Sequence, residues 1–238
     1  MNVTLINYTY RADDLLIFTK QTRLTLSPSL LYEIEMWPQE RKLQELQYMA
    51  QTIPSSWEFV DYVFLVEGVS RAYTHQQVRT RAGSYAQQTM RVNNMAEFDY
   101  VFTERNQANP LAMKILRRVL DAIRSGYTEL IELGHPTEDA RGILPTNIAT
   151  NIVCKFNLRT MAELAKSRTG GRTQGEYITV VNAMVDCILN VHPWAEQFLF
   201  ANHDRNYFEE IEAWAKAKLP DMAVRNELLK IVDAMRKS

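Results

Sequence analysis

The sequence predicts one domain of the α/β class, of the α+β kind, with a small sheet and many helices. A few short segments are rich in β-branched and aromatic residues, as strands are, while many longer segments place apolar residues at helical spacing. The 238 residues are enough to bury a core, and 46% hydrophobic with 23% charged residues is typical of a soluble globular protein. The domain is expected to span 1–238, with about 203–238 as a helical C-terminal extension.

The first half of the chain predicts strands and helices in alternation. The opening segment NVTLINYTY alternates and is β-branched, and WEFVDYVFLVEG has the same character. Pro38 stands at the start of a segment with helical spacing, where proline suits the first turn. Gly83 separates a helical segment from a third strand. These patterns give strands at 2–10, 57–68 and 84–92 and helices at 11–24, 38–53 and 69–81.

The second half is mostly helical. Gly134 ends a long apolar pattern, Pro136 begins a short helix, and Pro193 stops a long apolar one. NIVCKFN is the remaining strand-like segment. The expected elements are helices at 109–134 and 136–144, a strand at 151–157, and helices at 158–168, 174–192, 206–219 and 223–237.

Charge and cysteine content exclude several classes of protein. The net charge of −1 argues against bulk electrostatic binding of nucleic acid. Two cysteines are too few for a disulfide framework, which favours a reducing compartment. The N-terminus lacks the pattern of a signal peptide, and no segment has the roughly 20 apolar residues of a membrane span. A cytoplasmic protein is expected.

An acid-free segment between Glu67 and Glu97 holds several arginines. On a helix over 68–80, every fourth residue from 71 shares one face, and on a strand over 84–92 alternate residues share one face. If this helix and strand abut, they form a cationic pocket with neutral hydrogen-bonding groups. The residues concerned are Arg71, His75 and Arg79 on the helix and Gln87, Thr89 and Arg91 on the strand.

Such a pocket suits a phosphate-bearing ligand, because a planar guanidinium donates two parallel hydrogen bonds to phosphate oxygens. The glutamine and threonine side chains would add donors and acceptors for a base or a sugar. A basic, solvated surface is the alternative that spacing alone leaves open.

The stretch EGVSRAYTHQQVRTRAGSYAQQTMR, residues 67–91, resembles the signature of the flavin-dependent thymidylate synthases. Two further stretches are similar to that family's motifs and follow in the same order. EDARGILP, residues 138–145, matches an Ala-Arg followed by Leu-Pro, and NLRTMAELAKSR, residues 157–168, matches an Asn-x-Arg helix with its closing arginine. A Gln-x-Glu follows at Gln174 and Glu176. Three ordered motifs over about 58–176 are far more specific than one.

The resemblance implies a single α+β domain with a small, mainly antiparallel sheet flanked by many helices, and a homotetramer with active sites at subunit interfaces. It implies transfer of a one-carbon unit from methylenetetrahydrofolate to carbon 5 of deoxyuridylate (dUMP), giving thymidylate (dTMP). FAD would be the cofactor, NADPH its reductant, and no metal would be needed. No enzyme cysteine would attack the pyrimidine, and Cys154 and Cys187 lie in apolar settings where a thiolate is disfavoured.

The resemblance also implies roles for single residues. Arg168 would sit on the pyrimidine and stabilise negative charge on the ring, which makes it the expected catalytic residue. A nucleotide pocket is expected from Gln76, Arg79, Gln87, Thr89, Arg91, Arg141 and Arg168, and flavin contacts from Arg79, Arg81, Asn157 and Arg159. Other roles remain open for three of them. Asn157 could cap the following helix, Arg141 could form a local salt bridge with Glu138 or Asp139, and Arg168 could be a cation that complements a helix dipole.

Several positions depart from the family pattern. Thr80 replaces the middle histidine of the arginine triplet, Phe59 follows Glu58 where a histidine is expected, and Glu163 replaces an asparagine. Ala86 and Thr89 stand where serines are usual. Positions 59, 80 and 163 face flavin or folate in the family. A kept arginine framework with changed flavin-side residues suggests a divergent member.

Three alternatives therefore remain open at the level of sequence. The default is dUMP methylation. A viral or bacteriophage relative in the host cytoplasm would methylate or hydroxymethylate dCMP or dUMP at carbon 5. A nucleotide- or RNA-binding protein without catalysis is the alternative of another class. The sequence distinguishes neither uracil from cytosine nor a methyl from a hydroxymethyl product.

Overall fold

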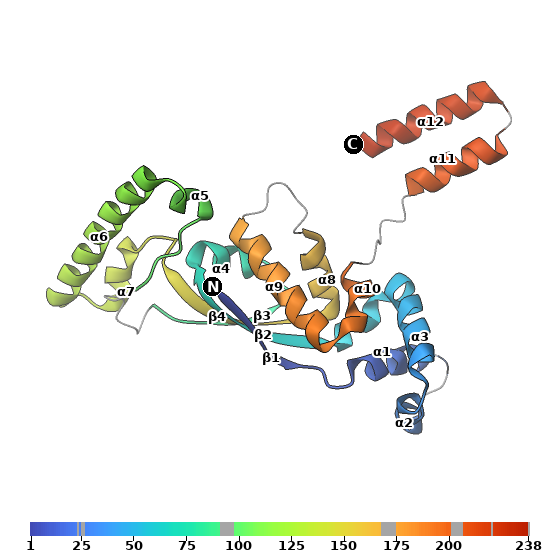
Figure 1. The fold of residues 1–238 in the computed structure, drawn as a ribbon, viewed down its shortest axis with the longest axis horizontal. Helices are drawn as coiled ribbons and strands as arrows, with labels where there is room; N and C mark the ends of the chain where they lie inside the picture. Colours follow the sequence, from blue (N-terminus) through green and yellow to red (C-terminus); the bar gives the residue numbers. More distant parts are fainter. Residues whose placement is uncertain are drawn as a thin grey trace. The chain divides into compact units, whose positions relative to one another are not determined.

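The computed structural model describes residues 1–22, 24, 27–90, 98–167, 175–200, 207–219 and 221–237. The chain forms two compact units, Met1–Ala201 and Asn202–Ser238. The first unit contains a four-stranded antiparallel sheet and most of the helices (Figure 1). The α+β fold class predicted from the sequence is thus confirmed.

The sheet has the strand order β1-β2-β4-β3, and each neighbouring pair is antiparallel. Its central strands alternate buried and partly exposed residues, which is the pattern of a sheet with one covered face. The strands are β1 (Asn2–Tyr8), β2 (Asp61–Ser70), β3 (Ser84–Gln87) and β4 (Ala149–Asn157).

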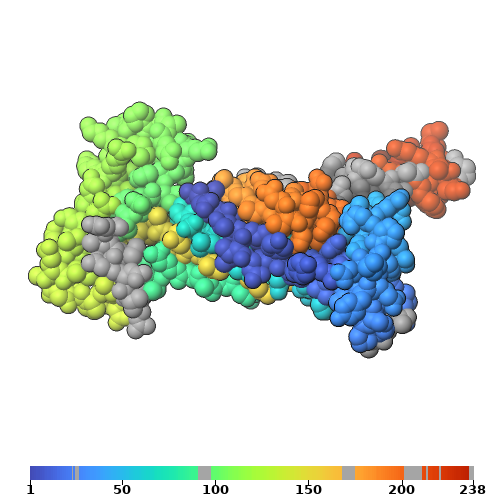
Figure 2. Space-filling view, turned by 60° about the horizontal axis from the view of Figure 1, so that its bottom comes forward, coloured from blue at the N-terminus to red at the C-terminus, as the bar shows by residue number. Residues whose placement is uncertain are grey.

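Two helices, α8 (Leu158–Ser167) and α9 (Gly175–Val191), cover the buried face of the sheet (Figure 1). Helix α9 lies against β1 and β2, and α8 lies against β4. Figure 2 shows β1, in dark blue, running along α9 at the surface. Fully buried Phe64 and Phe156 lie in the core between these elements. Each such side chain stabilises the fold by roughly 1.5–3 kcal/mol when it leaves water.

The remaining helices of the first unit gather in two groups. The N-terminal group packs on the main core, and α6 with its neighbours packs on a second, smaller core built around Phe98, Tyr127 and Ile148. The first group contains α1 (Ala12–Gln21), α2 (Ser29–Glu35), α3 (Gln39–Thr52) and the 3₁₀ helix Pro54–Phe59. The second contains α5 (Glu104–Gln107), α6 (Pro110–Glu132), α7 (Thr137–Ala140) and the 3₁₀ helix Arg141–Ile143. The 3₁₀ helix Pro193–Ala195 and α10 (Glu196–Leu199) end the unit.

A β-bulge at Gly68 redirects the chain where β2 meets the candidate site. The pairing of β2 with β4 shifts between Val66 and Val69, and Gly68 has φ of 64°. This left-handed backbone conformation favours glycine, and bulges bend a strand. The Gly68 N–H donates to the side chain of Asn151 at 3.0 Å, which fixes the bulge to β4.

Two predicted boundaries at the candidate site are wrong. The helix predicted over 68–80 is α4 (Arg71–Gln77), and the strand predicted over 84–92 is the shorter β3. After Gln77 the chain makes tight turns, with Arg79 N–H bonded to the Gln76 carbonyl and Thr80 N–H to that of Gln77. Residues 57–59 are 3₁₀ helix rather than strand, and α2, α5 and α10 were not predicted.

The second unit is a pair of helices, α11 (Tyr207–Lys218) and α12 (Met222–Lys237). They pack on one another, and Ala215 and Val232 are buried in their contact. Both helices lie where helical spacing predicted them. That 1–238 is a single domain with an extension stays a prediction.

Candidate functional site

The serine that caps helix α4 forms hydrogen bonds both within that helix and to helix α9. Ser70 is the N-cap, because its hydroxyl accepts a hydrogen bond from Tyr73 N–H at 3.0 Å. Its backbone N–H and its hydroxyl donate to the two carboxylate oxygens of Glu176, at 2.7 and 2.5 Å. Glu176 lies in the first turn of α9. These bonds fix the position of Arg71, the first residue of α4.

Arg71 and Arg141 bring two positive charges together. Arg71 is partly buried, and its Nε has no hydrogen-bond partner among the described residues. Burial lowers the pKa of Arg71, and the nearby charge of Arg141 lowers it further. Arg141 donates from Nε to the carbonyl of Glu138 at 3.2 Å, so its contact with Glu138 includes the main chain. A like-charged pair with an unsatisfied buried donor suits an anion.

Strand β3 and helix α4 abut, as the cationic-pocket hypothesis requires. Gln87 on β3 donates through its amide to the Thr74 hydroxyl on α4 at 2.8 Å. That hydroxyl donates to the Arg71 carbonyl at 3.1 Å. These two hydrogen bonds hold Gln87 beside the first turn of α4, which begins at Arg71.

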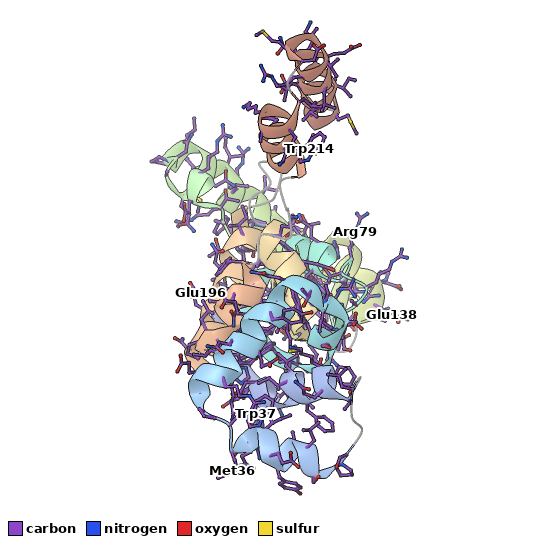
Figure 3. The ribbon with its side chains drawn as sticks, turned by 90° about the vertical axis from the view of Figure 1, so that its right-hand side faces the viewer. Met36, Trp37, Arg79, Glu138, Glu196 and Trp214 are labelled. Carbon is purple, nitrogen blue, oxygen red and sulfur yellow. The ribbon has the colours of Figure 1, made fainter. Side chains whose placement is uncertain are left out.

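The turn that links α4 and β3 carries Arg79 and Arg81. Both side chains are exposed, and Figure 3 shows Arg79 at the surface of the first unit. Because α4 ends at Gln77, Arg79 is not on a helical face with Arg71 and His75, and that expectation is corrected. The described arginines of the acid-free segment instead lie in two places. Arg71 begins the helix, and Arg79 and Arg81 lie in the turn after it.

The two predicted flavin contacts, at the end of β4 and the start of α8, already have protein partners. The side-chain oxygen of Asn157 accepts from Thr160 N–H at 2.9 Å, so it does cap the start of α8. Arg159 forms an ion pair with Glu58 at 2.7 Å and lies 3.7 Å from Glu163. These pairs are substantially exposed, so solvent screening makes them weak and open to exchange with a ligand.

Other predicted residues are only partly located. Gln76 and Thr89 are exposed, and each has an interaction within the chain. Arg91, Arg168 and Gln174 lie outside the described residues. Within the described ranges, no three histidine, cysteine or acidic side chains gather as metal ligands do. In the same ranges, no helix is long and apolar enough to cross a membrane.

The cysteines behave as their apolar settings predict. Cys154 is fully buried in β4, and burial raises the pKa of its thiol to about 12. Burial also raises the pKa of Cys187, which is partly exposed on α9. Both thiols therefore stay protonated near neutral pH, and neither is an activated nucleophile.

Sequence reasoning missed the importance of Arg71, Ser70 and Glu176. All three residues belong to the motifs quoted from the sequence. Helical spacing, however, placed Arg71 only on the same helix face as Arg79 and assigned it no partner. The partner of Arg71 comes from 70 residues further along the chain, which no local pattern reveals. The Gln-x-Glu motif was the feature of the sequence from which a role for Glu176 could have been predicted.

The fold and this edge of the sheet define a protein suited to a small anionic ligand. The model of one family, described as thymidylate synthase complementing protein, matches residues 4–194. The chain belongs to this family.

Relatives agree with that assignment. The chain is 31% identical over 177 residues to the flavin-dependent thymidylate synthase of Nitratidesulfovibrio vulgaris strain Hildenborough, covering 67% of this chain and 72% of the relative. It is 28% identical over 193 residues to that of Sulfurisphaera tokodaii, covering 81% and 75%. A third, from Clostridium tetani, is 26% identical over 211 residues, covering 81% and 84%. The family match ends before α11 and α12.

Proposed function

We propose that the chain is a flavin-dependent thymidylate synthase that converts dUMP to dTMP. Family membership and the names of the relatives support this function. The observation that carries it is the Arg71–Arg141 pair. The two positive charges repel, and Arg71 Nε has no hydrogen-bond partner among the described residues, so a bound anion would stabilise the pair. A nucleotide phosphate is such an anion, and arginine is the residue best suited to bind it.

The nucleotide site would be assembled around this pair. Arg71 and Arg141 would hold the phosphate, and Arg79 would approach from the adjoining turn. Gln87 donates to Thr74 at the same edge, and its amide oxygen can accept a hydrogen bond from a base or sugar. Gln76, Thr89, Arg91 and Arg168 complete the proposed pocket on the basis of the family resemblance alone.

The described residues also fit an anionic dinucleotide cofactor such as FAD. Arg79 and Arg81 are exposed on one turn and can pair with a diphosphate. Arg159 would leave its exposed ion pair with Glu58 to bind the cofactor. The side-chain oxygen of Asn157 caps α8, and its amide N–H₂ could donate to the cofactor. A bound flavin reduced by NADPH would supply the hydride that completes the methyl group. The chain would orient the ring and the nucleotide and supply positive charge.

Methylenetetrahydrofolate would donate the carbon, and the protein would not use a cysteine. The raised pKa of Cys154 and its complete burial support a route without thiolate attack on the pyrimidine. Arg168 would stabilise negative charge as carbon 5 of the pyrimidine becomes nucleophilic.

A homotetramer with shared active sites is the proposed assembly. The apolar helix α9 gives little support to this assembly, because β1, β2, α4 and α8 of the same chain already pack against it. The outer face of the sheet gives more support. Val63, Leu65 and Val153 lie there and stay partly exposed, as residues at a subunit contact do in a separated chain. A monomer by light scattering at micromolar concentration with FAD would contradict this assembly.

One assay tests the function. The purified protein is incubated with FAD, NADPH, methylenetetrahydrofolate and either dUMP or dCMP, and the product mass is read. We expect a flavin absorption spectrum and a product heavier than dUMP by the mass of one CH₂ unit, because a methyl group replaces the hydrogen at carbon 5. Product from dCMP, or a hydroxymethyl mass, would change the assigned substrate or product. A colourless protein that ignores FAD but binds single-stranded RNA in a salt-dependent manner would refute the enzyme.

A further inference from the structure

The hydroxyl of Tyr85 joins the two sides of the turn that carries Arg79. Tyr85 lies on β3, and its hydroxyl is 2.8 Å from the carbonyl oxygen of Gln77 and 2.7 Å from that of Thr80. Gln77 is the last residue of α4, and Thr80 lies between the two exposed arginines. One phenol thus contacts acceptors before and after Arg79.

Each of these carbonyls also accepts a backbone hydrogen bond within the turn, Gln77 from Thr80 N–H at 3.1 Å and Thr80 from Gly83 N–H at 3.0 Å. A carbonyl oxygen has two lone pairs, so each can accept from the phenol as well, and the phenol then joins the two consecutive turns. A phenol has one proton, which it shares between both acceptors. It therefore holds them at a common distance and defines the path of the chain between them.

The packing around Tyr85 leaves its ring little freedom. Its ring contacts Phe156 edge to face, with centroids 5.8 Å apart. A Cβ at Gly83 would lie 2.6 Å from the Tyr85 hydroxyl and 2.4 Å from a ring carbon of Phe156. Glycine at 83 is therefore what lets the chain cross directly over the phenol.

A second phenol meets the same turn from α9. Tyr177 is 8% exposed; burial raises the pKa of its hydroxyl, and the side chains of Thr80 and Ser167 are near enough to oppose that rise. Thr80 is the residue that replaces the family's histidine. Ser167 ends α8, immediately before Arg168. Tyr85 of β3 thus holds the turn through hydrogen bonds, and Tyr177 of α9 lies near Thr80 in the same turn.

We propose that Tyr85 is a positioning residue whose hydroxyl sets the direction of Arg79 and Arg81 toward an anionic ligand. This inference rests on the proposed function for the identity of that ligand, FAD or the nucleotide. Arg79 and Arg81 make the contact, and Tyr85 acts through them. Without the hydroxyl, the turn keeps its backbone hydrogen bonds but loses the link between its two ends. It then samples more conformations, and binding must select one of them.

The test deletes one oxygen atom. Tyr85→Phe is compared with wild type and with Tyr100→Phe, a matched control whose hydroxyl donates to the Leu120 carbonyl at 3.0 Å in the second core. Amide hydrogen exchange is measured over 78–83 without ligand, and FAD and dUMP affinities are measured by titration. In Tyr85→Phe we expect exchange in the turn to rise and FAD affinity to fall, each by about tenfold. The melting temperatures of the two variants should be similar.

The outcomes separate this inference from the proposed function. If wild type binds neither FAD nor dUMP, the proposed function fails, and unchanged exchange at 78–83 in Tyr85→Phe would overturn the positioning role as well. If wild type binds both and Tyr85→Phe binds them equally well, only the inference is overturned. A much lower melting temperature than that of Tyr100→Phe, with exchange raised throughout the chain, would also overturn it, because Tyr85 would then be a general structural residue.

Discussion

At the scale of single residues, the effect of the Arg141 charge on Arg71 is the most informative. Two guanidinium groups repel unless an anion lies between them or solvent screens them. Arg141 stands beside two acids in sequence, which left a local salt bridge open. The structure gives its Nε to the Glu138 carbonyl and places its charge next to Arg71. That arrangement favours ligand binding over local stability.

Arg141→Ala should therefore weaken nucleotide binding strongly and leave folding nearly unchanged. Removing one hydrogen-bonded partner of a phosphate costs about 2 kcal/mol or more, roughly thirtyfold in affinity. Isothermal titration with dUMP and thermal melting give the two quantities. FAD affinity serves as the internal control, and equal losses of nucleotide affinity and stability would return Arg141 to a structural role.

Arg168 allows a sharper distinction between two chemical roles. A cation near the end of a helix gains about 0.3–1 kcal/mol from the dipole, and lysine meets that requirement equally. A planar fork on a pyrimidine has no equivalent in an ammonium group. Arg168→Lys should keep the fold and bound flavin but lose product formation by about a hundredfold. Turnover near the wild-type rate would assign Arg168 to the helix terminus.

At the scale of elements, α4 is held at its start by another helix. Glu176 on α9 accepts both donors of Ser70, so α4 and α9 are fixed to one another beside Arg71. Hydrogen bonds to a charged group contribute about 1.5–3 kcal/mol, more than neutral ones.

Glu176→Gln should lower the free energy of unfolding by about 1.5 kcal/mol, because an amide offers one acceptor oxygen in place of two. Glu163→Gln is the control, since Glu163 is exposed and its contact with Arg159 is long. Its effect should stay within about 0.5 kcal/mol. Urea denaturation measures both, and similar losses in the two variants would contradict the role of Glu176.

The types of most long elements were predictable from local pattern, and the boundaries at the site were not. Helix α6 and helix α9 have strong apolar periodicity and clear stop signals at Gly134 and Pro193. The end of α4 depends on Tyr85 and Gly83, which act through contacts made only in the folded chain. Helical propensity alone continues past Gln77, so the sequence placed Arg79 on the wrong element.

At the scale of the whole molecule, a buried histidine links stability to pH. His192 is 7% exposed, and its Nδ1 lies 3.0 Å from the Tyr62 hydroxyl on β2. Burial lowers the pKa of His192, and the charge of Asp13 opposes this only in part. The unfolded chain therefore binds a proton at higher pH than the folded chain, near the ordinary value of about 6.5.

The resulting stability is fully present above about pH 6.5 and is lost as the pH falls toward the lower pKa of the folded state. The free energy of unfolding should decrease between about pH 7 and pH 5, and His192→Gln should make that decrease smaller. His135→Gln, at an exposed histidine, is the control and should keep the wild-type slope. Parallel slopes in all three proteins, measured by urea denaturation, would show that His192 is not the source.

The family and fold class were predictable from the whole sequence because three motifs occur in one order over more than a hundred residues. The candidate site was predictable only as a set of residues. Its geometry joins segments around 71, 85, 141 and 176, and such distances across the chain leave no periodic trace. The native sheet creates these neighbours, and no local propensity encodes them.

The Nε of Arg71 has no hydrogen-bond partner among the described residues, so an anion that binds there should raise the melting temperature of the protein. A group that binds only the folded chain raises the melting temperature by mass action, in proportion to the logarithm of its concentration over its dissociation constant. Here the bound phosphate would also remove a repulsion that the free chain carries. A panel of nucleoside monophosphates ranked by melting temperature would thus reveal base preference, uracil against cytosine, without any catalytic turnover.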